Sequence, residues 1–248
     1  MTRFWQGVCA KLVGLIALVA LWELACVVLG SYWVPGVVAV AERMWSELLN
    51  GSLLRDLVST TYLFVVGTAI GLFIGVCAAC VLRLMPRLDH AVQPLITALM
   101  SIPKLGLVPL LVLWFGVGWM PKVLLVVLTV LFIVFAITYS GLVTVNPRLV
   151  TTATVLGATP LQVTWYIVLP TVWPFVLTGL EVALPWAVSA ALVAEFLSAQ
   201  VGIGHEIEQA RQMSDSVGVF YGIVVATVLV LVCNLALTAA RRLTVKGP

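Results

Sequence analysis

Charged side chains are scarce in this 248-residue chain. Asp, Glu, Lys and Arg together make up 9% of the residues, whereas a soluble domain carries about 25%. Hydrophobic residues make up 62%, so a soluble helical protein of this composition would lack the polar helix faces that it needs. The composition therefore excludes a soluble domain and indicates an integral membrane protein.

Histidine and cysteine are too few and too scattered for a metal centre or a disulfide framework. The chain has two His and five Cys. Cys77 and Cys80 have CxxC spacing, but they lie inside a long apolar run, where small residues one turn apart are typical of a packed helix. We therefore expect this chain to bind no metal and no cofactor of its own.

Motifs of nucleotide-binding and hydrolytic enzymes are also missing. The sequence contains no GxxxxGK[ST], no GxSxG and no HExxH, so it lacks the usual means of holding nucleotide phosphates or activating a nucleophile. We expect a protein that is not an enzyme. Its net charge of +3 reflects membrane topology and gives no indication of a nucleic-acid partner.

Long apolar runs predict an all-α membrane protein with six transmembrane helices. A helix needs about 20 apolar residues to cross a bilayer, and lipid excludes open sheets and exposed loops. The spans are expected near residues 11–30, 58–82, 91–115, 121–143, 171–197 and 217–240. They divide the chain into an N-terminal transmembrane helix with an external amphipathic segment (1–51), a transmembrane core (52–242) and a cytoplasmic tail (243–248).

The distribution of Lys and Arg predicts the orientation of these spans, because cytoplasmic loops carry an excess of both. With both termini in the cytoplasm, the inner side receives eight basic residues: Arg3, Lys11, Arg83, Arg87, Arg148, Arg241, Arg242 and Lys246. The outer side receives four: Arg43, Arg55, Lys122 and Arg211. The connection at residues 146–170 is then cytoplasmic.

This cytoplasmic connection contains helix signals that are unusual between two membrane spans. Asn146 is suited to cap a helix N-terminus, and Gly157 is suited to end that helix in a left-handed conformation. Thr159 and Gln162 then have the spacing of a capping box that begins a second helix. The pattern predicts a short helix–turn–helix outside the lipid, suited to contact a partner.

Three glycines lie four residues apart in the second predicted span. Gly67, Gly71 and Gly75 share one helix face, and small residues at that spacing allow another helix to approach closely. The partner helix can belong to the same chain or to a second subunit.

The third predicted span is irregular and contains a charge. It is interrupted by Pro94, Pro103 and Pro109. Broken backbone at membrane depth is tolerated where it is buried in protein or lines a watery cavity. Lys104 therefore either lines a solute pathway and attracts an anion, or pairs with an acid in the fifth span, Glu181 or Glu195.

Glu181 and Glu195 lie fourteen residues apart, which is close to four helical turns, so they fall roughly on one face. A proton relay through the two carboxylates would suggest an ion-coupled secondary transporter. No chain of partner groups accompanies them in the sequence, so this remains the alternative function.

Several motifs in order along the chain resemble the permease subunits of binding-protein-dependent ABC importers. The main one is the stretch SIPKLGLVPL at 101–110, followed by LWFGVG at 113–118. Shorter matches continue at YSGL (139–142), LGA (156–158), VLP (168–170), TGL (178–180), AE (194–195) and GIG (202–204). The resemblance covers about residues 52 to 242, and it points to the branch that serves nitrate, sulfonates, taurine and related small solutes.

This resemblance implies a type I importer permease in the bacterial cytoplasmic (inner) membrane. Its partners would be a second copy or a related permease, two ABC ATPase subunits that bind ATP and Mg, and a periplasmic or lipid-anchored solute-binding protein. The permease would form the pathway for a small, often anionic solute. The expected pathway residues are Pro103, Lys104, Glu181 and Glu195.

The resemblance also implies that the cytoplasmic connection is the coupling helix that docks on the ATPase. The expected coupling residues are Thr151, Ala153, Leu156, Gly157, Ala158, Thr159 and Gln162. Two departures from the family pattern are visible: Thr151 replaces a glutamate, followed by Thr152 in place of alanine, and Glu181 stands where relatives commonly have arginine.

Overall fold

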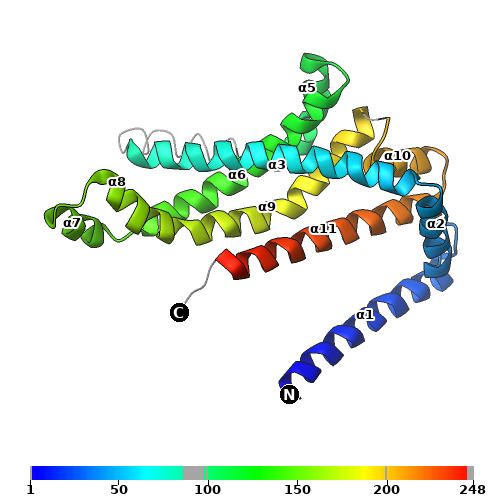
Figure 1. Ribbon diagram of the computed structural model, residues 1–248. Helices are drawn as coiled ribbons and strands as arrows, with labels where there is room; N and C mark the ends of the chain where they lie inside the picture. The colour runs from blue at the N-terminus through cyan, green and yellow to red at the C-terminus, as the bar shows by residue number, and fades with distance from the viewer. Residues whose placement is uncertain (1, 86–97, 99, 199, 245–248) are drawn as a thin grey trace.

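Four long helices lie alongside one another and form the body of the molecule (Figure 1). They are α3 (Ser52–Leu84), α6 (Trp119–Thr144), α9 (Leu169–Ser198) and α11 (Ser216–Thr244). The computed structural model describes residues 2–85, 98, 100–198 and 200–244, and in these ranges all regular secondary structure is helical. The expectation of an all-α fold is confirmed.

Four of the six expected spans are confirmed. Helices long and apolar enough to cross a membrane run over Ser52–Leu84, Trp119–Thr144, Pro160–Leu197 and Ser216–Ala239. The first expected span lies in α1 (Thr2–Leu29), whose apolar stretch in the described residues, Ile16–Leu29, is shorter. Most of the third, including Pro94, lies outside the described residues. The six-span count is therefore not confirmed.

Helix α6 is the centre of the core, between α3 and α9. Its valines at 126, 130 and 134 are fully buried. The glycines of α3 face this helix: a Cβ on Gly71 would lie 2.9 Å from the Val127 carbonyl oxygen, and one on Gly75 2.8 Å from that of Leu131. The glycine ladder thus packs within the chain, and the alternative of a subunit interface is wrong for this face.

Helix α9 approaches α6 with small residues as well. Five alanines of α9 are fully buried: Ala183, Ala187, Ala190, Ala191 and Ala194. In lipid there is little hydrophobic drive for helices to associate, so close van der Waals packing stabilises them. Valine on α6 with glycine and alanine on its two neighbours provides that packing.

The third expected span is broken in its described part. Pro103 (φ −70°, ψ 90°) precedes the short 3₁₀ helix η1 (Lys104–Leu107), and α5 (Val108–Phe115) follows with Pro109 in its first turn. Proline lacks the N–H that a continuous helix needs. The predicted irregularity is confirmed here, and it positions Lys104 beside α6 and α9.

Short helices cover the end of the bundle where α3 begins and α9 ends. They are α2 (Val37–Leu49) and α10 (Ile203–Gln212), drawn at the right of Figure 1. Helix α1 leads away from the body and is fixed at its C-terminal end, where Trp22 Nε1 donates to the Pro35 carbonyl (2.8 Å) and Glu23 accepts from the Val37 N–H (2.8 Å). The Glu23 carboxylate thereby satisfies a free N–H of the first turn of α2.

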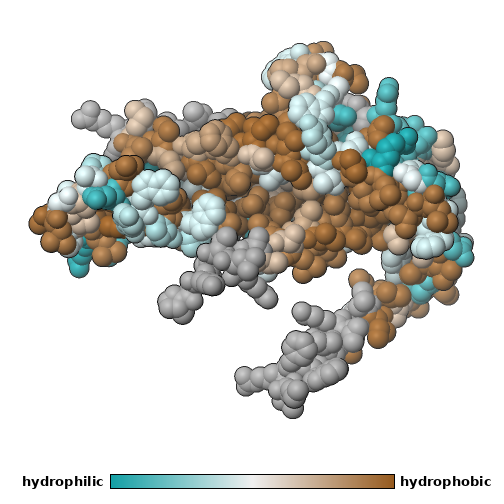
Figure 2. Space-filling view, viewed as in Figure 1, coloured by the Kyte–Doolittle hydropathy of each residue, from teal (hydrophilic) through white to brown (hydrophobic). Residues whose placement is uncertain are grey.

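The opposite end of the molecule is formed by α7 (Pro147–Val155), α8 (Pro160–Val163) and the π-helical turn η2 (Thr164–Val168) that leads into α9. Figure 2 shows a hydrophobic surface along the bundle, with hydrophilic residues gathered mainly at the two ends, near α7–α8 and near α10. This distribution is that of a helix bundle whose ends leave the lipid.

Candidate functional site

The connection between α6 and α9 folds as its helix signals predict. The Asn146 side chain accepts from the Arg148 N–H (2.9 Å) and caps α7. Thr159 and Gln162 form the capping box of α8: the Thr159 N–H donates to Gln162 Oε1 (2.8 Å), and the Gln162 N–H donates to Thr159 Oγ1 (3.3 Å). Each cap satisfies backbone groups that the helix leaves free.

Gly157 ends α7 in the left-handed region, with φ at +89°. Its N–H donates to the Thr154 carbonyl (3.0 Å), and the Ala158 N–H donates to the Ala153 carbonyl (2.9 Å). These two bonds form a Schellman motif. The motif fixes the direction in which the chain turns from α7 into α8.

The two helices enclose a shallow hollow at the tip of the molecule. Its volume is about 440 Å³, and its lining residues are Ala153, Leu156, Gly157, Ala158, Gln162, Val163, Tyr166 and Ile167. We call this hollow and its rim the α7–α8 surface. Thr159 caps the helix on its rim, and the exposed Thr151 donates its hydroxyl to the Pro147 carbonyl (3.0 Å) within α7. The seven residues expected to couple to a partner therefore gather at one end of the molecule.

Apolar side chains on the α7–α8 surface are exposed although they lie beyond the bundle. Val155, Leu156 and Tyr166 are each about 80% exposed. An exposed apolar patch of this kind is a candidate surface for contact with a partner protein. Sequence reasoning missed Tyr166 and the neighbouring Trp165; the signal available was two adjacent aromatics immediately after a capping box.

Lys104 lies on the wall of a second cavity, about 480 Å³ in volume. The lining residues are Pro103, Lys104, Leu105, Thr129, Ile133, Val182 and Trp186. The ammonium donates to the Met100 carbonyl (2.9 Å) and lies 5.3 Å from the centroid of the Phe132 ring. The Lys104 side chain thus bonds a backbone carbonyl four residues before it in the chain.

The hypothesis of an ion pair between Lys104 and Glu181 or Glu195 is wrong in this conformation. Among the described residues, neither acid lies within 4.0 Å of the Lys104 ammonium. Glu181 of α9 instead pairs with Arg241 of α11 (2.6 Å). The negative charge of Glu181 is thus compensated by a cation on a neighbouring helix.

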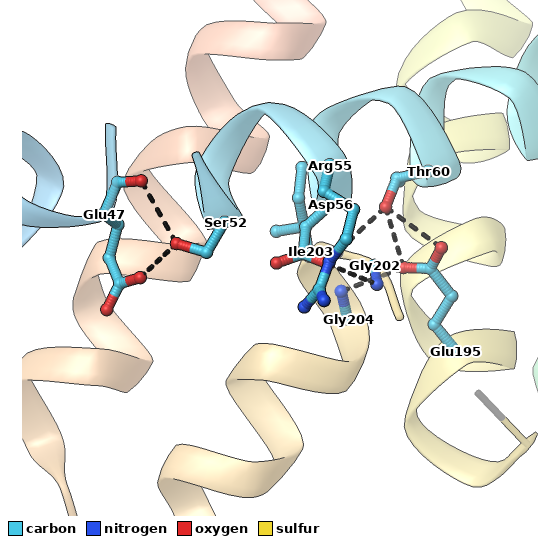
Figure 3. Close-up of polar contacts among 9 residues, drawn as sticks. All are labelled: Glu47, Ser52, Arg55, Asp56, Thr60, Glu195, Gly202, Ile203 and Gly204. Atoms are coloured by element: carbon cyan, nitrogen blue, oxygen red, sulfur yellow. Dashed lines mark hydrogen bonds and ion pairs between the residues drawn. The ribbon is translucent and has the colours of Figure 1, made fainter. Parts of the chain in front are cut away.

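Glu195 is buried in a polar network near the α10 end of the bundle (Figure 3). Its side chain is 1% exposed. Both carboxylate oxygens accept from the Thr60 hydroxyl (3.0 and 2.9 Å), and one also accepts from the Gly204 N–H (2.9 Å). These bonds satisfy the carboxylate inside the protein and connect α9 to α3 and α10. Glu195 is not among the described residues that line the cavity of Lys104.

Two further members of this network come from the first turns of α3. The Gly202 N–H donates to Asp56 Oδ1 (3.0 Å), and the Ile203 N–H donates to Thr60 Oγ1 (2.9 Å) (Figure 3). Asp56 and Thr60 are both buried. Sequence reasoning missed them, although two polar residues four apart at the start of an apolar span indicate a shared buried partner.

The proton relay through Glu181 and Glu195 finds no support in these contacts. The two carboxylates bind separate partners, Arg241 for one and Thr60 with Gly204 for the other. Each is fixed by a contact between helices, which accounts for a carboxylate in an apolar span without a transport role.

Replacing Gly202 by alanine is expected to destabilise the network strongly. Gly202 has φ at +127°, and a Cβ there would lie 2.3 Å from Glu195 Oε1. We expect the free energy of unfolding to fall by about 2–4 kcal/mol, because the Glu195 carboxylate must leave the hydrogen-bond partners that satisfy it inside the protein. The measurement is the midpoint of thermal unfolding of the detergent-solubilised protein.

The matched control is Gly116→Ala. Gly116 also has a positive φ (+76°), but no atom of the described residues lies within 4 Å of the position that a Cβ would take there. It therefore carries the backbone strain without the clash. Equal destabilisation by both substitutions would contradict the role given to the Glu195 network.

The polar surface beside this network belongs to α2 and α10. Arg43 pairs with Glu47 (2.8 Å), and Arg211 forms two bonds with Glu208 (2.6 and 2.7 Å). The hydrogen bonds from Arg211 lower the pKa of Glu208 to about 2, so this pair remains ionised at neutral pH. The end of the bundle near α10 thus presents fixed charges to water.

Comparison with known proteins assigns the chain to a family. Residues 67–247 match the binding-protein-dependent transport system inner membrane component. The chain belongs to this family. It is therefore a multi-pass permease of the inner membrane, and the residues of the α7–α8 surface and of the Lys104 cavity lie in the matched region.

Curated relatives of this permease cover most of its length. It is 30% identical over 215 residues to the formylaminopyrimidine transport permease protein ThiX of Halalkalibacterium halodurans, covering 86% of each chain. It is 31% identical to the putative aliphatic sulfonates transport permease protein SsuC of Bacillus subtilis, covering 86% of the permease and 78% of the relative. The taurine transport system permease protein TauC of Escherichia coli is 29% identical, with 80% and 69% covered.

Solved structures show the same fold. One is the MetNI methionine ABC transporter in an inward-facing conformation, with a TM-score of 0.70 at 18% identity, covering 81% of the permease and 99% of that chain. Another is an amino acid ABC transporter, with a TM-score of 0.61 at 16% identity, covering 79% and 94%. The type I importer fold implied by the sequence motifs is confirmed.

Proposed function

We propose that this permease converts the motion of a separate ATPase into access for a small organic anion. The observation that carries the proposal is the α7–α8 surface, a hollow with exposed apolar side chains at a bundle end, held by two caps and a Schellman motif. A rigid surface of this kind is suited to receive a push and pass it to α6 and α9, which it joins directly. The sequence supplies no phosphate-binding loop, so the partner subunits would bind ATP and Mg.

The proposed mechanism is a rigid-body change. Closure of two ATPase subunits on ATP would move the α7–α8 surface, and the attached helices would turn the pathway from inward-facing to outward-facing. The pathway itself would form between this permease and a second copy or a related permease. The exposed Val182 and Trp186 support this arrangement, because they leave the cavity of Lys104 open on one side, where the second permease would complete its wall.

The proposed orientation has both termini in the cytoplasm. In Figure 1 the C-terminal end of α11 points back towards the α7–α8 end, away from α10. In this orientation Arg83, Arg148 and Arg241 would lie on the cytoplasmic side, as expected because cytoplasmic segments carry an excess of basic residues. The surface of α2 and α10 would then face outward, where a solute-binding protein delivers its ligand.

The experiment that tests this function is copurification followed by transport. Affinity-tagged permease, expressed with its cognate system, should copurify with a P-loop ATPase subunit of separate sequence. In proteoliposomes with the binding protein outside, solute should accumulate only when ATP is enclosed, and an ionophore should leave the uptake unchanged. Uptake that needs no ATPase and collapses with the ionophore would establish the alternative, an ion-coupled secondary transporter.

A further inference from the structure

We infer that the cavity of Lys104 is a binding site of the permease itself, selective for an organic monoanion with an apolar body. This inference rests on the proposed function and specifies the solute class. It predicts that an alkyl- or arylsulfonate, or the matching carboxylate, binds better than an inorganic oxyanion or a zwitterion such as taurine.

The charge of the cavity supports an anion. Lys104 is the one ionisable side chain among the described residues that line it. Its ammonium contacts a carbonyl oxygen and the face of Phe132; both are favourable for a cation, but neither carries a formal charge that would neutralise it. A sulfonate or carboxylate bound in the cavity would supply the neutralising charge together with a strong hydrogen bond.

The rest of the lining supports an apolar solute body. Leu105, Ile133, Val182 and Trp186 form most of the wall. The hydroxyl of Thr129 in this wall already donates to the Leu125 carbonyl (2.8 Å). A solute with many polar groups would lose hydration here without gaining partners, whereas an alkyl chain or an aromatic ring would gain contact with Trp186.

The size and the charge pattern of the cavity separate three kinds of anion. A volume of about 480 Å³ lies in the range of sites for organic ligands, and nitrate would leave it largely empty. The ammonium group of taurine would find no carboxylate in the described lining and would lie in the same cavity as Lys104. An organic monoanion without a cationic group meets neither difficulty.

The first test compares four probes on the wild-type complex. Permease with its ATPase subunits is placed in nanodiscs without ATP and without binding protein, and equilibrium dialysis measures binding of benzenesulfonate, benzenesulfonamide, methanesulfonate and taurine. Benzenesulfonate is expected to bind at least about tenfold more tightly than its neutral sulfonamide, since a bond to a charged partner is the stronger one. It should also bind more tightly than methanesulfonate, which lacks the ring, and than taurine, which adds the ammonium.

The second test uses variants with matched controls. Lys104→Gln is expected to weaken benzenesulfonate binding about 10- to 100-fold, and Lys104→Arg to retain most of it. Trp186→Ala should weaken binding of benzenesulfonate more than that of methanesulfonate. Lys122→Gln and Trp45→Ala make the same chemical changes away from the cavity and should leave binding unchanged.

The outcomes distinguish this site from the transport proposal. Equal binding of sulfonate and sulfonamide, tighter binding of taurine, or wild-type affinity in Lys104→Gln would overturn the inference. The sulfonate-to-sulfonamide ratio is measured on the wild type, so it decides the question even where a variant fails to fold. The binding test needs no ATP hydrolysis; a complex that binds benzenesulfonate as expected but shows no ATP-driven uptake would refute the proposed function and leave the site standing.

Discussion

Replacing Gly157 by valine is expected to reduce ATP-driven uptake by roughly tenfold or more while the helix bundle stays folded. Gly157 lies at φ +89°, a conformation that a β-branched residue rarely adopts. A strain of about 2 kcal/mol is enough for such a factor in a conformational equilibrium. Valine would turn α8 away from α7 and alter the α7–α8 surface on which the ATPase is proposed to dock.

Uptake and ATPase activity are both measured in proteoliposomes, together with the yield of assembled complex. Loss of uptake can then be separated into uncoupled ATP hydrolysis and failed assembly, and either result fits the proposed role. Gly157→Asn is expected to retain much of the activity, because asparagine tolerates the left-handed conformation.

The matched control for backbone strain is Gly30→Val. Gly30 also has a positive φ (+87°) and open space around it, but it lies just after α1 rather than beside α7. It should lose far less uptake than Gly157→Val. Wild-type transport by Gly157→Val at normal expression would refute the coupling assignment.

Replacing Gly71 by leucine is expected to remove folded permease from the membrane almost completely. A Cβ at this position would already lie 2.9 Å from the Val127 carbonyl oxygen and 2.9 Å from the Val130 Cβ. Leucine adds further carbon atoms between two helices in direct contact, so we expect the free energy of unfolding to fall by about 3 kcal/mol or more. The measurement is the monodisperse peak of a fluorescent fusion in size-exclusion chromatography.

The control for this substitution is Gly14→Leu. Gly14 lies in α1, and no atom of the described residues is within 4 Å of its potential Cβ, so leucine there should leave the yield unchanged or raise it through better helix propensity. The yield of Gly71→Ala should lie between the yields of Gly71→Leu and Gly14→Leu. A normal yield of Gly71→Leu would mean that α3 and α6 are not in the close contact described.

The local signals in the sequence were sufficient for the connection between α6 and α9. Asn146, Gly157 and the capping box of Thr159 and Gln162 act within a few residues of themselves, so nothing distant in the chain is needed to predict their geometry. The same applies to the break at Pro103, which follows from the missing N–H of proline.

Contacts between distant residues were not predictable in this way. Whether Lys104 pairs with Glu181 depends on how helices α9 and α11 lie relative to η1. In the structure Glu181 pairs instead with Arg241, sixty residues away in the chain. Glu195 likewise meets Thr60, 135 residues away. Helix periodicity indicates which face a residue occupies, but it does not indicate which helix that face meets.

The sequence by itself determined that this protein is a helical membrane protein, because apolar composition, span length and helix caps are local properties of the chain. The tertiary structure decided which charged side chains have partners on other helices. It satisfied Glu181 and Glu195 with partners inside the protein, and it placed Lys104 on the wall of an apolar cavity, with a carbonyl and a ring beside it. The physical reason is that a charge in an apolar region needs a partner, and only the packing of the helices determines which charges receive one.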